Sequence, residues 1–311
     1  MKIAFVFPGQ GSQHVGMGKE IHEGFPEARE VFQEASDALG YDVAGLCFSG
    51  PAEELNKTFR TQPSILTVST AISRVLSGRG IKPSIVAGHS LGEYSALVAS
   101  GVISFSVAVK LTEKRGAFMQ EAVPEGRGLM AAILGLERRT VDEICLSLQS
   151  GYAAPANYNC PGQIVIAGER AAVEEAIIRA KEADARRAVP LSVSVPSHCR
   201  LMAAASERLG EILDTIEFRI PAVPLVNNAD ALILNAVENI KTSLVRQLNS
   251  PLLWEDTIRV IRDSGVETFV EVGPGRVLSG LIKRIVDGSK ILNVEDIKSL
   301  DKTLTELTPS T

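Results

Sequence analysis

The sequence predicts an α/β protein in which helices cover both faces of a mostly parallel sheet, with a second, smaller unit inserted. Two features of the chain support this prediction. Short apolar runs alternate with helix-like segments over most of the 311 residues, a pattern typical of parallel strands joined by crossover helices. Between residues 125 and 196 the alternation changes to a different order of strands and helices.

The large unit begins within residues 1–124. Proline near the start and glycine near the end delimit one of its helices, and Ser104 is a suitable N-cap for another. The expected elements are a strand at Lys2–Phe7, a helix at Pro26–Leu39 ended by Gly40, a helix from near Pro63 to Gly78, a strand at Ser84–Ala87, and helices at Glu93–Ala99 and Ser104–Glu121.

The inserted unit begins at the break Pro124–Gly128. Its order of elements, β-α-β-β-α-β, predicts a ferredoxin-like domain over residues 125–196, which leaves residues 1–124 and 197–311 as the large domain. The turn Asn159-Cys160-Pro161-Gly162 joins the two middle strands. The expected elements are Leu129–Leu134, helix Thr140–Leu148, Tyr152–Asn157, Gln163–Ala167, helix Ala171–Ala183 and Ala188–Val193.

The large unit resumes after Pro196. Its expected elements are helices at Arg200–Leu213 and Ala236–Leu248, a strand at Glu267–Val272 and a helix at Val277–Val286. The residues after Val286 match no pattern from which a prediction follows, and the tail after Leu304 is polar.

Composition narrows the function classes. A formal net charge of −5 and a pI of about 5.6 disfavour nucleic-acid binding. The four cysteines form no Cys-x-x-Cys and the four histidines have no zinc spacing, so we expect no metal and a reducing, cytoplasmic location. We also expect no cofactor. The apolar run Ile3–Phe7 is too short for a signal peptide, and no apolar stretch reaches the length of a membrane span.

The most informative segment is Gly88-His89-Ser90-Leu91-Gly92. It places Gly-x-Ser-x-Gly directly after an apolar strand and directly before a helix, which is the context of a nucleophile elbow. Small flanking residues allow a sharp turn that presents the hydroxyl beside a helix N-terminus. Ser90 is therefore a candidate nucleophile for acyl chemistry. The alternative is a glycine-rich turn with a buried serine.

A serine nucleophile requires a base, and His198 is the best candidate. It lies in the loop Ser194–Cys199, where the chain re-enters the large domain; the alternative is a surface histidine. Neighbouring residues on a tight turn point apart, so we expect His89 to pack below the elbow. His14 could line the site, and His22 is expected to be solvated.

The base in turn requires an acceptor that orients its ring. A hydrolase places an acid between the serine and the histidine. The acids available there lie on the small unit's polar helix or its edges, as a solvated face would: Glu169, Glu174, Glu175, Glu182 and Asp184. A carbonyl or amide is the alternative acceptor, and Gln247 is the candidate.

An oxyanion requires N–H donors. The main-chain N–H of Leu91 follows the nucleophile, and the loop Gly9-Gln10-Gly11 is a second source because glycines allow close approach. The same loop also suggests phosphate binding. It lacks Gly-Lys-Ser/Thr, however, and His14 stands where a dinucleotide fingerprint requires glycine.

Arg115 shares the inward face of its helix with Leu111, Phe118 and Met119, its i−4, i+3 and i+4 neighbours. Most helix arginines are solvated. One on a buried face requires an anion, and a bidentate carboxylate is the natural partner.

Together these residues resemble the malonyl-CoA:acyl carrier protein transacylases, the acyltransferases that load malonyl groups in bacterial type II fatty acid synthesis. The resemblance runs from residue 5 to about residue 287, and the ordered set of motifs is far more specific than Gly-x-Ser-x-Gly alone. The matching segments are Phe7–Gln13, Gly88–Tyr94, Arg115, Asn159 with Pro161–Gln163, Val195–His198, Gln247-Leu248 with Pro251 and Trp254, and Glu271–Gly275.

The resemblance implies an α/β-hydrolase-like core with a ferredoxin-like insertion. It also implies ping-pong transfer of malonyl from CoA to the phosphopantetheine thiol of acyl carrier protein, through a malonyl-serine. The implied roles are Ser90 as nucleophile, His198 as base, Gln247 as a marker of the segment that orients the base, Gln10 and Leu91 as oxyanion donors, Arg115 as the partner of the malonyl carboxylate, and Met119, Asn159 and Ser197 as further substrate-binding residues.

The expected partners are malonyl-CoA and an acyl carrier protein, with no nucleic acid and no membrane, and the expected state is a monomer. Basic residues that could dock an acidic carrier are Arg186, Arg187, Lys283 and Arg284, although most such clusters are only solvated faces. Two other functions remain. A serine thioesterase or esterase requires a buried acid near the base, whereas a non-catalytic carrier-binding module would not need Ser90, His198 and Arg115 together.

Overall fold

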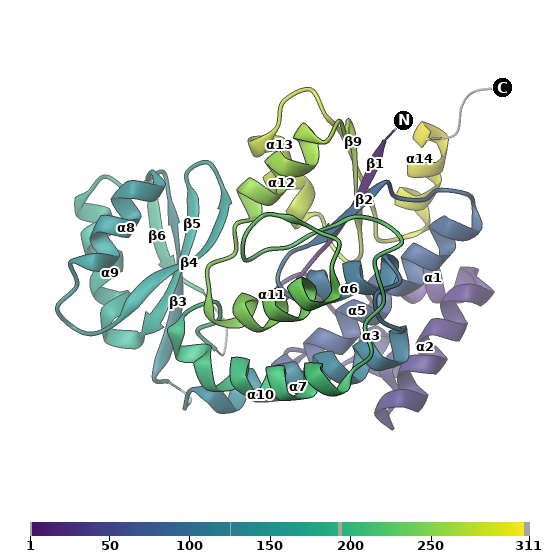
Figure 1. Ribbon diagram of the computed structural model, residues 1–311, viewed down its shortest axis with the longest axis horizontal. Coiled ribbons are helices and arrows are strands. Elements are labelled where there is room, and N and C mark those ends of the chain that lie inside the picture. The colour runs from purple at the N-terminus through teal and green to yellow at the C-terminus, as the bar shows by residue number, and fades with distance from the viewer. Residues whose placement is uncertain (1, 125, 192–194, 308–311) are drawn as a thin grey trace.

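Two β-sheets form the frame of the protein. The computed structural model describes residues 2–124, 126–191 and 195–307 (Figure 1). The larger sheet has the order β10-β9-β1-β2-β7-β8, and all neighbours are parallel except β7 and β8. The predicted mostly parallel sheet is confirmed. Its strands are β1 (Ile3–Phe7), β2 (Ile85–Gly88), β7 (Leu225–Val226), β8 (Ile233–Leu234), β9 (Thr268–Val272) and β10 (Lys290–Val294).

Helices cover both faces of this sheet, as expected of a parallel sheet with crossover connections. Successive side chains of β1 point to opposite faces, so Phe5 and Phe7 enter one core whereas Ala4 and Val6 enter another. The first core includes α2 (Pro26–Leu39), α5 (Thr58–Gly78), α7 (Phe105–Ala122), α10 (Ala203–Thr215) and α11 (Val237–Asn249). The second includes α12 (Trp254–Asp263) and α13 (Val277–Ile285).

The smaller sheet is antiparallel, with the order β4-β5-β3-β6. Its strands are β3 (Gly128–Leu134), β4 (Ala153–Cys160), β5 (Gln163–Glu169) and β6 (Arg187–Pro190), and its helices are α8 (Arg138–Leu146) and α9 (Arg170–Glu182). It stands to one side of the larger sheet in Figure 1. Main-chain hydrogen bonds join β4 to Leu252, just before α12, at 2.8 and 2.9 Å. These bonds hold the small sheet against the large unit.

Most predicted elements are present within one or two residues. Gly40 ends α2 with φ 74°, and the Ser104 hydroxyl caps α7 by accepting from Val107 N–H. Some predicted boundaries are wrong. Helix α5 begins at Thr58 and contains Pro63. Pro63 is the sixth residue of α5, beyond the first turn where proline is well tolerated, so the helix continues through a position that lacks one intrahelical hydrogen bond. Strand β4 runs to Cys160 and not to Asn157, so Asn159 and Cys160 of the predicted turn belong to the strand. Arg200–Met202 is a 3₁₀ turn that precedes α10.

Several elements of the fold were not predicted from the sequence. The C-terminal segment, which gave no prediction, forms the edge strand β10 and the helix α14 (Ile297–Leu307), with Leu300 and Leu307 buried. The others are α1 (Lys19–Gly24), α3 (Val43–Ser49), α4 (Ala52–Leu55), α12 and the short strands β7 and β8. The predicted strand Ala188–Val193 is β6 as far as Pro190, and residues 192 and 193 lie outside the described residues. Within the described ranges, no helix is both long and apolar enough to cross a bilayer.

Candidate active site

The segment around Ser90 forms a tight strand–turn–helix. Strand β2 ends at Gly88, α6 (Gly92–Ala99) begins four residues later, and Ser90 adopts φ 54°. This left-handed conformation is strained for a non-glycine residue. A Cβ on Gly88 would lie 1.9 Å from the Gly92 carbonyl carbon, and a Cβ on Gly92 would lie 2.0 Å from Phe7 O. The two glycines of the motif are therefore required by close backbone packing.

Asn228 binds both sides of this turn. Its Oδ1 accepts from Ser90 N–H at 2.8 Å, and its Nδ2 donates to Gly88 O at 2.8 Å. The side chain is fully buried and follows β7, the sheet neighbour of β2. No local pattern in the sequence points to Asn228, since only the pairing of β2 with β7 brings it to the elbow.

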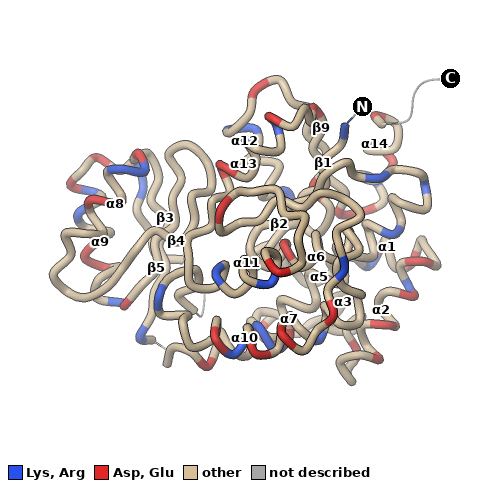
Figure 2. The backbone as a smooth tube through the Cα atoms, viewed as in Figure 1, with Lys and Arg blue, Asp and Glu red and all other residues tan. Residues whose placement is uncertain are grey.

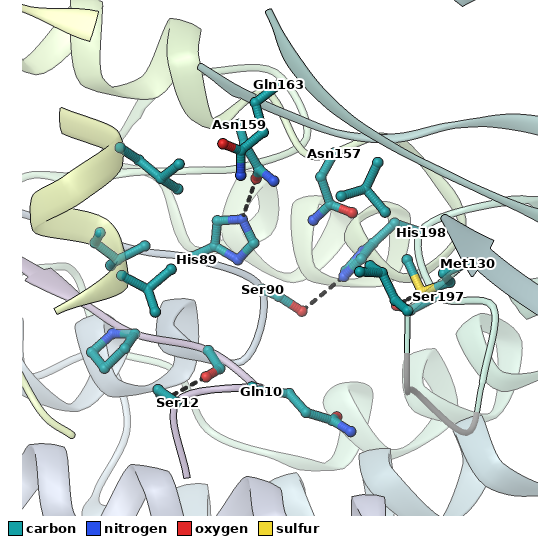
Figure 3. A pocket seen from close by; sticks show the side chains of 18 of the residues that line it. Gln10, Ser12, His89, Ser90, Met130, Asn157, Asn159, Gln163, Ser197 and His198 are labelled. Carbon is teal, nitrogen blue, oxygen red and sulfur yellow. Dashed lines mark hydrogen bonds between the residues drawn. The ribbon is translucent and has the colours of Figure 1, made fainter. Parts of the chain in front are cut away.

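The structure brings Ser90 and His198 together across 108 residues of sequence. His198 Nε2 lies 2.8 Å from Ser90 Oγ, and its Nδ1 lies 2.7 Å from the main-chain carbonyl of Gln247 (Figure 3). The ring acceptor is thus a carbonyl in the segment that the sequence had indicated. The acids of the small unit's polar helix are exposed, apart from Glu175, which binds Ser150.

Burial and charge keep His198 neutral. Its side chain is 2% exposed, and burial, followed by the positive charge of Arg115, lowers its pKa to about 3, although the Gln247 carbonyl opposes the shift. A neutral imidazole that donates from Nδ1 to the carbonyl leaves Nε2 free to accept the Ser90 proton. The geometry therefore provides a base for the hydroxyl at neutral pH.

Arg115 lies on the inward face of α7, as predicted, and is only 1% exposed. Its Nη1 donates to Gln62 Oε1 at 2.7 Å, and its Nη2 donates to Gln247 Oε1 at 3.0 Å and to Ser90 Oγ at 3.3 Å. Among the described residues it has no carboxylate partner, and its Nε makes no hydrogen bond. A buried cation beside a nucleophile can take an anionic ligand.

A cavity of about 220 Å³ opens at Ser90, between the large unit and the small sheet. In Figure 3 the hydrogen-bonded side chains of Ser90 and His198 lie at this cavity, with Gln10 on one side of them and Asn157 and Asn159 on the other. Four of the predicted substrate and oxyanion residues line it, namely Gln10, Met119, Asn159 and Ser197. Leu91 is fully buried. The main-chain N–H groups of Gln10 and Leu91 have no acceptor within the described part of the chain, so both remain available to an oxyanion.

Three expectations about histidines need correction. His89 lines the cavity instead of packing below the elbow; it hydrogen-bonds Asn159 Oδ1 at 2.9 Å and contacts the Trp254 ring edge-on. His14 is exposed and is not among the residues that line this cavity. His22 is half-buried against Phe32 and Phe48, because α1 packs on α2 and α3.

Two further polar residues near Ser90, namely Glu93 and Asn157, were not predicted as part of the site. Glu93 is fully buried, accepts from Gln247 Nε2 at 2.8 Å and from Asn228 N–H at 3.1 Å, and burial raises its pKa to about 7. A carboxylate in the first turn of an otherwise apolar helix was the available signal. Asn157 lines the cavity, is 6% exposed, and its Oδ1 has no partner among the described residues. Asn157 and Asn159 both line the cavity from β4, whose pairing with β5 is irregular between Tyr158 and Cys160.

Comparisons with known proteins agree with this geometry. Residues 4–304 match the model of the acyl transferase domain. A malonyl CoA-acyl carrier protein transacylase of Escherichia coli (strain K12) is 53% identical over 288 residues, 92% of this chain and 93% of that protein.

Two solved structures superpose closely. An acyl carrier protein S-malonyltransferase from Vibrio cholerae has a TM-score of 0.95 and 49% identity, over 97% of this chain and 100% of that one. A malonyl-transacylase in complex with its type II PKS acyl-carrier protein has a TM-score of 0.96 and 50% identity, over 98% of this chain and 100% of that one. The match spans both sheets and every residue of the site, and the chain therefore belongs to the acyl transferase domain family.

Proposed function

We propose that this chain transfers a malonyl group from malonyl-CoA to the phosphopantetheine thiol of an acyl carrier protein, through a malonyl ester of Ser90, for fatty acid biosynthesis. The observation that carries the proposal is the buried guanidinium of Arg115, 3.3 Å from the nucleophile and without a carboxylate partner among the described residues. The names of the relatives, malonyl CoA-acyl carrier protein transacylase, point to the same reaction.

The first half-reaction forms the ester. Ser90 Oγ attacks the thioester carbonyl carbon while His198 Nε2, at 2.8 Å, accepts the hydroxyl proton. The carbonyl oxygen becomes an oxyanion, which the N–H groups of Gln10 and Leu91 stabilise. The C–S bond then breaks, and the proton passes from His198 to the CoA sulfur.

The second half-reaction reverses the order of these events. The carrier thiol enters the emptied cavity and gives its proton to His198, and its sulfur attacks the ester carbonyl. Ser90 leaves as the alcohol by taking the proton back. The main-chain carbonyl of Gln247 holds the ring throughout, because it fixes the proton on Nδ1.

Arg115 selects the acyl group in this proposal. A malonyl carboxylate can use its free donors, whereas an acetyl group leaves the buried cation unpaired. Met119, Asn159 and Ser197 shape the remaining walls of the cavity, which accepts the thioester and the start of its arm.

A thioesterase on the same elbow receives no support from the surroundings of the base. The partner of His198 Nδ1 is a carbonyl, and the buried acid Glu93 binds the Gln247 side chain and the main chain of Asn228. A ring oriented without negative charge is less basic than one paired with a carboxylate. That difference and the exclusion of water favour a thiol as acceptor.

We also propose the finer description of the fold. The strand order β4-β5-β3-β6, with one helix between β3 and β4 and another between β5 and β6, supports a ferredoxin-like domain at residues 125–196. The elbow on a parallel sheet supports an α/β-hydrolase-like core at residues 1–124 and 197–311. Glu125 lies outside the described residues.

The proposed carrier contact lies at the rim of the cavity. Arg284 donates to Pro161 O and to Gln163 Oε1, and Gln163 lines the cavity. Arg186 approaches Gly135, whose N–H donates to Gly162 O, so both arginines flank the β4–β5 turn. Lys283 and Arg187 are exposed beside them in sequence. Elsewhere basic and acidic positions are interspersed, as along α7, α9 and α10 (Figure 2).

The remaining parts of the proposal are a monomer that needs no cofactor and works in the cytoplasm. All four cysteines are free, which supports a reducing location. The described residues contain no group of three or more His, Cys, Asp or Glu side chains placed to hold a metal ion.

Intact-mass measurement tests the function. The protein is incubated with malonyl-CoA, with acetyl-CoA in parallel and Ser90→Ala as control. We expect a stoichiometric malonyl adduct that is absent in the control and is discharged by holo acyl carrier protein. Steady release of malonate without an adduct would indicate a thioesterase, and neither adduct nor turnover would leave a binding role only.

A further inference from the structure

The carboxylate of Glu93 is buried directly after the elbow, in the first turn of α6. Burying a carboxylate is unfavourable unless hydrogen bonds satisfy it. Another buried acid, Glu271, binds the main-chain N–H groups of Leu278 and Ser279 at the start of α13, which is an ordinary structural use. Glu93 differs because it turns toward the site and binds a side chain there.

The side chain that Glu93 binds is Gln247. Its Nε2 donates to Glu93 Oε2 at 2.8 Å and to Ser90 O at 2.9 Å, while its Oε1 accepts from Arg115 Nη2 at 3.0 Å. Rotating this amide by 180° would place its oxygen against a carboxylate and a carbonyl, and its NH₂ against a guanidinium. Both contacts would be repulsive, so Glu93 and Arg115 require the same orientation.

The amide thus links Glu93 to the buried guanidinium. Arg115 donates hydrogen bonds to Gln62 on one side and to Gln247 on the other. These two bonds position its Nη2 3.3 Å from Ser90 Oγ. The side chain is 1% exposed and has no direct ion pair among the described residues. Its position beside the nucleophile therefore depends on an amide that Glu93 orients.

We propose that Glu93 is a positioning residue for acyl-group selection: through Gln247 it fixes the guanidinium of Arg115 where the carboxylate of a malonyl group must bind. The inference rests on the proposed function. The proposed role depends on the length of the Glu93 side chain, called its reach below, because the acceptor oxygen must extend to Gln247 Nε2. Burial, which raises the pKa of Glu93 to about 7, is consistent with a role that does not need its charge.

Two conservative variants separate reach from charge. Glu93→Asp keeps the carboxylate but withdraws it by about 1.5 Å, the length of one carbon–carbon bond. Glu93→Gln loses the charge but keeps an acceptor oxygen at full reach. Glu271→Asp is the matched control, since it shortens another fully buried glutamate that also accepts two N–H donors.

The readout is the ratio of kcat/KM for malonyl-CoA to kcat/KM for acetyl-CoA, which does not depend on the fraction of enzyme that is folded. We expect Glu93→Asp to lower this ratio by about tenfold or more, because small misplacements of a binding group have effects of this order. Glu93→Gln should stay within a factor of about three of the unmodified enzyme, since its oxygen can accept the same two donors. Glu271→Asp should lower the Tm and leave the ratio unchanged.

Other results would overturn the inference in distinct ways. If the ratio is unchanged in both Glu93 variants, the residue is merely structural. If Glu93→Gln loses selectivity and Glu93→Asp retains it, charge and not reach is the requirement. If the unmodified enzyme shows no preference for malonyl-CoA, the proposed function itself fails.

Discussion

Replacing Arg115 with alanine is the most direct perturbation of the proposed selectivity. The substitution removes a guanidinium that is 1% exposed and leaves Gln62 Oε1 and Gln247 Oε1 without this donor. A malonyl carboxylate would then be buried without a partner, a penalty of about 3–5 kcal/mol. This corresponds to a loss of roughly a hundredfold to a few thousandfold in kcat/KM for malonyl-CoA.

Acetyl-CoA provides the internal control for this variant. An acetyl group carries no carboxylate, so acylation by acetyl-CoA is affected only by the loss of the 3.3 Å contact between Arg115 Nη2 and Ser90 Oγ. We expect this loss to cost about 1 kcal/mol, which is less than a tenfold decrease in kcat/KM for acetyl-CoA. The malonyl-to-acetyl ratio should therefore collapse even if the variant is less stable. The assay is the initial rate of adduct formation at Ser90 with each thioester.

A matched variant excludes a general effect of removing an arginine. Arg60 lies on α5 and pairs with Glu54 and Glu113 away from the cavity, so Arg60→Ala should leave the ratio unchanged. If Arg115→Ala kept the malonyl preference while remaining folded, the carboxylate role assigned to Arg115 would be refuted.

Three further predictions concern pH and packing. Because the pKa of His198 is lowered to about 3, the rate of Ser90 acylation should change by no more than about twofold between pH 8 and pH 5.5. A histidine with an unperturbed pKa would lose its base form in this range. A stopped-flow pH profile that falls with a midpoint near 6.5 would contradict the argument that burial lowers this pKa. The pKa of Glu93 is raised to about 7, so the folded state holds a proton that the unfolded chain releases near its usual pKa, and the free energy of unfolding falls as the pH rises through 7. In urea unfolding, the free energy of unfolding of Glu93→Gln should therefore increase by about 2 kcal/mol relative to that of the unmodified protein between pH 5 and pH 8. A difference that does not change with pH would show that burial does not shift the pKa of this group. Gly92→Ala should destabilise the protein by about 1–3 kcal/mol or more, because its Cβ would clash with Phe7 O. Gly280→Ala, with no atom within 4 Å of its Cβ, should be neutral or stabilise α13 by about 0.5–1 kcal/mol. Equal shifts in Tm for the two variants would refute the argument from close packing.

Local sequence signals predicted most of the fold. Apolar periodicity together with Gly40 and Ser104 located α2 and α7 within one or two residues, because caps and breakers act over a single turn. The same signals failed for α5, where Pro63 lies inside the helix, and for β10, which becomes a strand only by pairing with β9. Both depend on neighbours that a local pattern does not contain.

The candidate site likewise contains residues that local signals predicted and contacts that depend on distant segments. Ser90 followed from its own segment, since a strand, small residues and a helix are all local properties. Helical spacing predicted that Arg115 faces inward. The need for an acceptor that orients the His198 ring pointed to the segment of Gln247. The sequence did not show that this acceptor is the main-chain carbonyl, or that the Gln247 side chain turns toward Arg115 and Glu93.

Local patterns in the sequence were thus sufficient to predict the class of fold, Ser90 as the candidate nucleophile and the residue types available in the site. Which of these groups meet depends on how distant segments of the chain pack. Asn228 reaches the elbow because β7 pairs with β2, and His198 reaches Ser90 because its loop is anchored to the end of α11. A hydrogen bond between distant segments forms only when donor and acceptor are placed to within a few tenths of an ångström, and packing, not order along the chain, sets this placement.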